Sequence, residues 1–193
     1  PVIVTESGRA TVAHTSILLF NILDVTHFEP TELPTELPQG AHEMIVNLWH
    51  TLSVIRLSNL QESYNDVIYY RDKIRDFFHG GDISLRHRVL AENIYLAALQ
   101  KIASLLPQMK RVPTELEYLP ELLADIYYGN FSVFQSLPDS WAIGQVFPVM
   151  PIHRLNEAPT RQAIIADLTC DCDGKLKKFA GPEGETSTIA LHP

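Results

Sequence analysis

Apolar residues recur at helical spacing from Ala41 to about Tyr128, and no other feature constrains the fold of this chain more strongly. Side chains at positions i, i+3, i+4 and i+7 share one face of an α-helix, and an apolar face must be buried. Glycines, a proline and helix-capping residue types divide the run into segments. These residues are Ser58, Gly80, Gly81, Asp82, Ser84, Pro107 and Thr114. The pattern predicts four amphipathic helices packed as an antiparallel bundle over residues 41–129.

The third and fourth predicted helices differ in character. The third, from Leu85 to Leu106, is apolar over most of its circumference, which predicts a central position in the bundle. The fourth is expected to start at Thr114 and to stop before Gly129. Its apolar positions are Leu116, Leu119, Leu123, Ile126 and Tyr127. We interpret all these apolar faces as packing core rather than as a cofactor-binding surface.

The segments on either side of the bundle have β character. Residues 15–25 form a nearly continuous apolar run, and residues 162–170 give the clearest strand pattern in the chain. Residues 131–135 are also predicted to be a strand, followed by a capped single turn at 136–142. Two prolines make residues 146–152 at most an edge strand. The chain is therefore predicted to be a β domain interrupted by a helical bundle.

A proline-rich connector joins the first β segment to the bundle. Residues 28–40 contain three prolines four residues apart, and the sequence Pro-Thr-Glu-Leu occurs twice. Proline restricts both itself and the residue before it to extended conformations. We interpret this segment as a stiff linker rather than as a docking motif.

Charge and cysteine content exclude some classes of function. The net charge of −8, with no basic stripe, argues against nucleic-acid binding. No apolar run approaches the roughly 20 residues of a membrane span. The two cysteines are separated by one residue, which favours a reducing compartment such as the cytoplasm. The chain opens without Met on a strand-like segment, so we expect an internal fragment of a longer protein.

Two short clusters carry candidate chemistry. Glu6-Ser7-Gly8-Arg9-Ala10 follows an apolar run, and such a strand end can bind a phosphate on backbone N–H groups beside a carboxylate. The alternative is a strand-end salt bridge between Glu6 and Arg9. The second cluster, Thr169-Cys170-Asp171-Cys172-Asp173-Gly174, places a thiol among carboxylates. Two cysteines in one loop lack the ligands for structural zinc, and the eight histidines show no ligand spacing.

Three motifs together give the sequence a specific resemblance. They are Glu6 to Ala10, Phe134-Gln135-Ser136-Leu137-Pro138-Asp139-Ser140-Trp141-Ala142-Ile143, and Asp167-Leu168 followed by the Cys170 cluster. With the helical stretch Ser84–Leu99, they resemble the biosynthetic arginine decarboxylase family over essentially all 193 residues. That family has a fold-type III, alanine-racemase-like (β/α)8 barrel, a C-terminal β domain and an inserted bundle.

The resemblance implies an α+β fragment with five parts. Residues 1–14 would be the last strand and turn of the barrel, and residues 15–27 the first strand of the β domain. Residues 28–40 would be the linker and 41–129 the inserted four-helix bundle. Residues 130–193 would continue the β domain without completing it.

The resemblance also implies a cofactor site. Pyridoxal 5′-phosphate would be the cofactor, with Glu6 against its ring nitrogen and with Gly8 and Arg9 at its phosphate. Mg²⁺ is allowed as a second cofactor, although we assign no metal-binding residue.

The second cluster would carry the substrate chemistry. Cys170 would reach into a partner subunit's site and protonate the α-carbon, while Asp171 would bind the substrate's guanidinium with help from Asp173. Cys172 departs from the serine expected there. The lysine that attaches the cofactor in this family lies in an earlier barrel strand, so this chain alone is expected to be inactive.

The implied activity is conversion of L-arginine to agmatine and CO2 in polyamine (spermidine) biosynthesis, by a homodimer or higher homo-oligomer with shared active sites. Two alternatives remain open from the residues. One is decarboxylation of another basic amino acid, ornithine or diaminopimelate, although the motif containing Trp141 favours arginine. The other is a non-catalytic helical-bundle interaction module.

Overall fold

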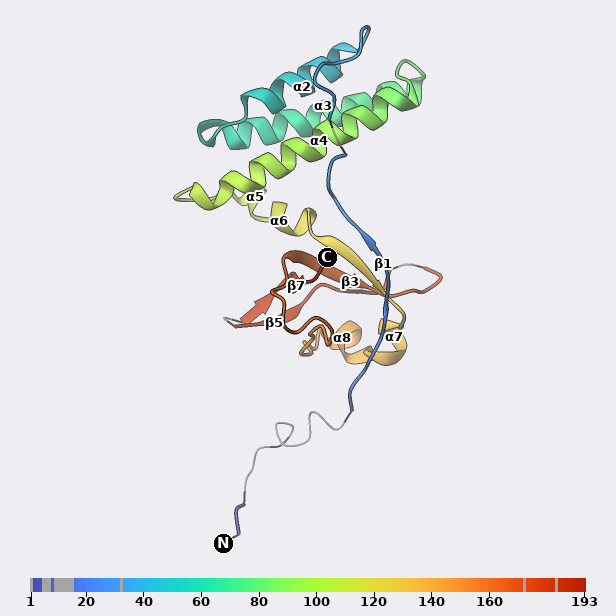
Figure 1. Ribbon diagram of the computed structural model, residues 1–193, viewed down its shortest axis with the longest axis vertical. Helices are drawn as coiled ribbons and strands as arrows, with labels where there is room; N and C mark the ends of the chain where they lie inside the picture. Colours follow the sequence, from blue (N-terminus) through green and yellow to red (C-terminus); the bar gives the residue numbers. More distant parts are fainter. Residues whose placement is uncertain (1, 5–7, 9–15, 32, 172, 183) are drawn as a thin grey trace.

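A helical bundle and a mixed β-sheet form the two parts of the structure (Figure 1). The computed structural model describes residues 2–4, 8, 16–31, 33–171, 173–182 and 184–193. The expectations for Glu6, Arg9 and Cys172 therefore lie outside the described residues. The predicted α+β class is confirmed.

Three long helices lie side by side in the bundle: α2 (Glu43–Val54), α3 (Leu60–Gly80) and α4 (Leu85–Leu105). The predicted cap at Ser84 is confirmed, because its hydroxyl accepts a hydrogen bond from the His87 N–H. Gly81 ends α3 with a φ of 87°, a left-handed conformation that suits glycine. The cap predicted at Ser58 is wrong: α3 is preceded by the 3₁₀ turn η1 (Leu57–Asn59), in which Asn59 Oδ1 accepts from the Arg56 N–H.

Helix α4 supplies the centre of the bundle core, as its sequence predicts. Ile94, Leu99 and Ile102 are at most 1% exposed. Together with the 3₁₀ turn η2 (Leu106–Gln108), this segment is long and apolar enough by composition to cross a membrane. Its apolar residues pack against α2 and α3, so we interpret it as the core helix of the bundle.

The fourth predicted helix is not continuous, and its last part, from about residue 123, is wrong. Two single turns, α5 (Thr114–Glu117) and α6 (Leu119–Leu122), bury Leu116 and Leu119 against the bundle. The chain then enters strand β2 (Asp125–Gly129), whose burial alternates along its length. The segment Ile-Tyr-Tyr-Gly has helical spacing relative to the preceding leucines, but its β-branched and aromatic residues pair with a neighbouring strand instead.

Strand β3 is the centre of the sheet. The other strands are β1 (Ile22–Thr26), β2, β4 (Lys175–Leu176) and β7 (Ile189–Leu191), while β5 (Phe179–Gly181) and β6 (Gly184–Thr186) form a separate hairpin. Strand β3 (Arg161–Ala166) pairs in parallel with β2 on one side, and β4 and β7 share its other side in antiparallel orientation. β1 pairs antiparallel with β2, so the inserted bundle connects two neighbouring strands.

The link from β2 to β3 contains a second correction. Residues 131–135 are not a strand, because α7 (Val133–Ser136) starts there with Ser132 as its N-cap. The predicted turn at 136–142 is confirmed as α8 (Pro138–Ile143). Residues 146–152 belong to no strand, as their two prolines suggest.

The connector at residues 28–40 is fastened to the bundle along its described part. The Gln100 side chain donates a hydrogen bond to the Phe28 carbonyl at 3.1 Å, and the Thr31 N–H donates to Asn93 Oδ1 at 3.0 Å. Leu33 and Leu37 pack against the bundle core. The described residues of the connector lack regular structure but are anchored along α4, in contrast to a free spacer.

A buried ion pair stands where the chain passes between sheet and bundle. Arg161, the first residue of β3, donates to both carboxylate oxygens of Asp125, the first residue of β2, at 2.6 and 2.9 Å. His27 Nδ1 lies 3.1 Å from the same carboxylate, and Arg161 also binds Glu29. The Asp125 side chain is 2% exposed. Burial alone would raise the pKa of Asp125, but hydrogen bonds from Arg161 and His27 outweigh burial and lower it.

Replacing Ile94 by alanine tests the bundle core. We expect I94A to lower the free energy of unfolding by roughly 2–5 kcal/mol, because it removes a fully buried side chain from α4. Val89→Ala on the same helix is the control, since Val89 is 52% exposed and its loss should cost less than about 0.5 kcal/mol. Urea unfolding, monitored by circular dichroism, measures the free energy of unfolding of both variants. Equal losses in I94A and V89A would contradict the placement of Ile94 in the bundle core.

Replacing Asp125 by asparagine tests the ion pair. We expect D125N to cost about 3 kcal/mol near neutral pH, because Arg161 loses its buried counter-charge. The folded pKa of Asp125 is lowered, so the stabilisation is fully present above the unfolded pKa of about 4 and is lost as pH falls through the folded pKa. The difference in free energy of unfolding between D125N and the unmodified protein, measured by urea unfolding at a series of pH values, should therefore shrink below about pH 4.

The matched control for D125N is Asp76→Asn, whose side chain on α3 is 73% exposed. Its effect should stay within about 0.5 kcal/mol at every pH. A pH-independent penalty in D125N would refute the role of the ionised pair.

Candidate functional site

The loop between β3 and β4 brings together the predicted substrate-side residues. It begins with Asp167, whose side chain is buried at 3% exposure, and returns to the sheet at Gly174. The Asp167 N–H donates to the Gly174 carbonyl at 2.9 Å, which closes the base of the loop. On the sheet side of this base, Ala166 and Lys175 form the first residue pair of the antiparallel ladder between β3 and β4. The loop is thus a short connection at the end of strands β3 and β4.

The Asp167 carboxylate fills the space between the two ends of the loop. Its Oδ2 accepts a hydrogen bond from the Val133 N–H at 2.8 Å, and its Oδ1 accepts from the Thr169 hydroxyl at 3.1 Å. A Cβ atom on Gly174 would lie 2.1 Å from Oδ2 and 2.3 Å from Cγ. Only glycine can therefore occupy position 174 while the carboxylate keeps this place.

Cys170 and Asp171 lie on the outer part of the loop. Both are exposed, and the Cys170 thiol donates to Asp171 Oδ1 with Sγ 3.4 Å from the oxygen. Asp173 is exposed as well. A proton donor and a carboxylate thus stand together where an external molecule can reach them, an arrangement that suits proton transfer beside a bound cation.

The structure describes only Gly8 of the three predicted cofactor residues. Gly8 is exposed and has a φ of 52°, a left-handed conformation that favours glycine. Among the described residues, no atom lies within 4 Å of the place a Cβ would occupy, so the left-handed conformation accounts for glycine here. An open backbone of this kind fits a phosphate-binding turn.

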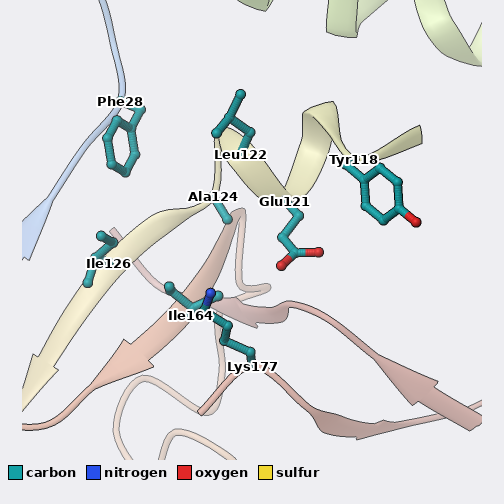
Figure 2. Close-up of a pocket in the computed structure, with 8 residues that line it drawn as sticks. All are labelled: Phe28, Tyr118, Glu121, Leu122, Ala124, Ile126, Ile164 and Lys177. Atoms are coloured by element: carbon teal, nitrogen blue, oxygen red, sulfur yellow. The ribbon is translucent and has the colours of Figure 1, made fainter. Parts of the chain in front are cut away.

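An apolar pocket between α6 and the sheet contains none of the predicted site residues. It has a volume of about 280 Å³ and lies between α6 and the face of the sheet that is turned toward the bundle. Figure 2 shows its lining, with Leu122 on α6, Ile126 and Ile164 on the strands, and Glu121 and Lys177 as the charged groups. It is open to solvent, and none of the predicted site residues lines it, so we do not assign it to the predicted chemistry.

Metal binding finds no support in the described part of the chain. Among those residues, no three His, Cys, Asp or Glu side chains are grouped so that they could hold a metal ion. The Mg²⁺ allowed by the resemblance therefore has no ligand set there.

The comparisons with known proteins agree with one another. A family model described as the arginine decarboxylase helical bundle domain matches residues 38–120. The biosynthetic arginine decarboxylase of Thermosynechococcus vestitus is 45% identical over 197 residues, covering 100% of this chain and 30% of the relative. That of Deinococcus radiodurans is 44% identical over 196 residues, with the same two coverages. This chain is homologous to part of the biosynthetic arginine decarboxylases.

A solved structure extends the likeness to the fold. The crystal structure of the biosynthetic arginine decarboxylase of Campylobacter jejuni superposes with a TM-score of 0.65 at 29% identity, covering 90% of this chain and 26% of that chain. The chain thus spans less than a third of the length of these decarboxylases. The resemblance read from the three sequence motifs is confirmed.

The matched bundle domain ends at residue 120, and the last helical turn before β2 ends at Leu122. Both observations place the end of the helical region before β2, in contrast to the predicted boundary at 129.

Sequence reasoning missed two pairs of buried contacts, one at the site and one at the opposite end of the same strands. Asp167 is the first residue of the third sequence motif, but the sequence predicts no role for it. Its partner Val133 is 34 residues away along the chain. The pairing of Asp125 with Arg161 was also missed. The local signal for Asp167 was an acidic residue after the apolar run 163–166, followed by a glycine at 174.

Proposed function

We propose that this chain is part of a pyridoxal 5′-phosphate-dependent enzyme that converts L-arginine to agmatine and CO2 in polyamine biosynthesis. The observation that carries the proposal is the 44–45% identity of the whole chain to proteins named biosynthetic arginine decarboxylase. These names favour arginine over ornithine and diaminopimelate. The exposed pair of Cys170 and Asp171 supplies groups suited to that reaction.

Glu6, Gly8 and Arg9 would hold the cofactor at the carboxyl end of a barrel strand. Glu6 would accept a hydrogen bond from the protonated ring nitrogen, and the backbone at Gly8 and the Arg9 guanidinium would bind the phosphate. When bound, the cofactor supplies an electron sink for the pair left behind as the carboxylate departs as CO2. The left-handed backbone of Gly8 supports this placement.

Cys170 would deliver the proton that completes the reaction. The bond from the α-carbon to the carboxylate breaks, and a new C–H bond forms with the proton of the Cys170 thiol, which leaves a thiolate to be reprotonated from solvent. The thiol is exposed and already donates a hydrogen bond, so its proton is directed by a neighbouring acceptor, Asp171 Oδ1.

Asp171 would select the substrate. A carboxylate binds a guanidinium through two parallel hydrogen bonds, which distinguishes arginine from an amine such as ornithine. Asp173, exposed on the same loop, would add negative charge. Because Cys170 and Asp171 project from the β domain into solvent, we propose that they complete a site on a partner subunit, in a homo-oligomer with shared active sites.

Removing the Cys170 thiol in the full-length protein tests the reaction. We expect Cys170→Ala to lower kcat for CO2 release from arginine on the order of 10²- to 10⁴-fold, because the proton donor is gone. Cys172→Ser is the matched control, since it removes the neighbouring thiol and is expected to keep kcat. A C170A enzyme with unchanged kcat, or an enzyme that prefers ornithine or diaminopimelate, would refute the proposal.

Neutralising Asp171 tests substrate selection separately. We expect Asp171→Asn to raise KM for arginine on the order of 10- to 100-fold, because a charged hydrogen bond to the guanidinium is lost. The same change at Asp173 should have a smaller effect. The ratio of kcat/KM for arginine to that for ornithine measures the loss, and an unchanged ratio in D171N would contradict the role of Asp171.

A further inference from the structure

We propose that Asp167 is the positioning residue of the Cys170 loop: its buried carboxylate sets where Cys170 and Asp171 stand relative to the substrate. The inference rests on the proposed function for its consequence in catalysis, but its geometric part can be measured without any activity. Asp167 itself is 3% exposed and does not reach the surface on which Cys170 and Asp171 lie.

The first argument is the direction of its contacts. One carboxylate oxygen holds the Thr169 hydroxyl at 3.1 Å, which draws the half-buried Thr169 toward the base of the loop. The residue that follows, Cys170, is exposed. Since the backbone between adjacent residues has few free torsions, fixing the Thr169 side chain restricts the direction in which Cys170 leaves the loop.

The second argument is lateral anchoring. The other carboxylate oxygen accepts from the Val133 N–H at 2.8 Å, and the Leu168 N–H donates to the Phe131 carbonyl at 3.3 Å. Residues 131–133 begin two positions after the end of β2 at Gly129, so these bonds fix the loop next to the end of the neighbouring strand. Without the carboxylate, the buried Val133 N–H at the start of α7 would lose this acceptor.

The third argument is the close fit at Gly174. The carboxylate fills the space that a side chain at position 174 would need, and the two residues are joined by a backbone hydrogen bond. The base of the loop is therefore packed as well as bonded. A group that transfers a proton must be held within hydrogen-bond reach of its target, so a fixed base has a direct consequence for Cys170.

The experiment compares Asp167→Ala with Asp167→Asn in the full-length protein carrying Cys172→Ser. Asparagine can still accept from the Val133 N–H and can donate to the Thr169 hydroxyl oxygen, whereas alanine can do neither. We expect D167A to lower kcat on the order of 10- to 100-fold and to raise KM for arginine, because both loop groups are displaced. D167N should stay within about threefold of the parent protein.

A second readout is the rate at which iodoacetamide alkylates Cys170, located by mass spectrometry. It should change severalfold in D167A and little in D167N. This measurement needs no turnover, so it separates the two proposals. Altered alkylation in a protein without decarboxylase activity would support the positioning role and refute the proposed function, whereas active D167A with unchanged alkylation would refute the positioning role alone.

Two further variants keep the test decisive. If D167A does not fold, Thr169→Val removes one of the bonds with little change in volume and should lower kcat about 2- to 10-fold. D125N is the matched control, because Asp125 is an equally buried carboxylate at the opposite end of the same pair of strands. It should lower stability but leave the alkylation rate of Cys170 unchanged. Equal effects of D125N and D167A on alkylation, or none from T169V, would overturn the proposal.

Discussion

The ion pair between Asp125 and Arg161 fixes the register of strands β2 and β3, on which the sheet and its junction with the helical bundle depend. It joins the first residues of two parallel strands, and the register that follows places Ile126 beside Ile164 and Tyr128 beside Ala166. At the far end of the same strands, Asp167 reaches the Val133 N–H. A two-residue slip would move one strand by about 6.6 Å and break both contacts at once. Two buried carboxylates thus define one register.

The same register explains how the chain accommodates a large helical insertion. The chain leaves the sheet after Thr26 and returns at Asp125, and Thr26 pairs with Ile126 across adjacent strands. The two ends of the insertion are therefore neighbours already. Because the entropic cost of closing a loop rises only slowly with its length, a whole bundle can stand between two such positions. His27 contacts Asp125 and Glu29 contacts Arg161, so the ion pair also binds the segment that leaves the sheet for the bundle.

The parts that sequence reasoning predicted are those encoded locally. Helical spacing identified α2, α3 and α4, and single residues such as Ser84 and Gly81 marked their ends. The error at 123–128 arose because helical spacing continues into β2, where pairing with β3 decides the conformation. Asp167 with Val133, and Asp125 with Arg161, are 34 and 36 residues apart, so no local pattern could reveal them. Cys170 and Asp171 could be proposed because they are adjacent.

The contact between Asp167 and Gly174 has an evolutionary consequence. The space inside the loop base holds either a carboxylate from one side or a side chain from the other, but not both. Substitutions at the two positions should therefore be coupled across homologous sequences: an acidic residue at 167 should always occur with glycine at 174, and a larger residue at 174 only where 167 is small. A larger residue at position 174 alone would clash with the Asp167 carboxylate, whereas a paired change avoids the clash. The shape of this loop should therefore persist while the surface residues around it diverge.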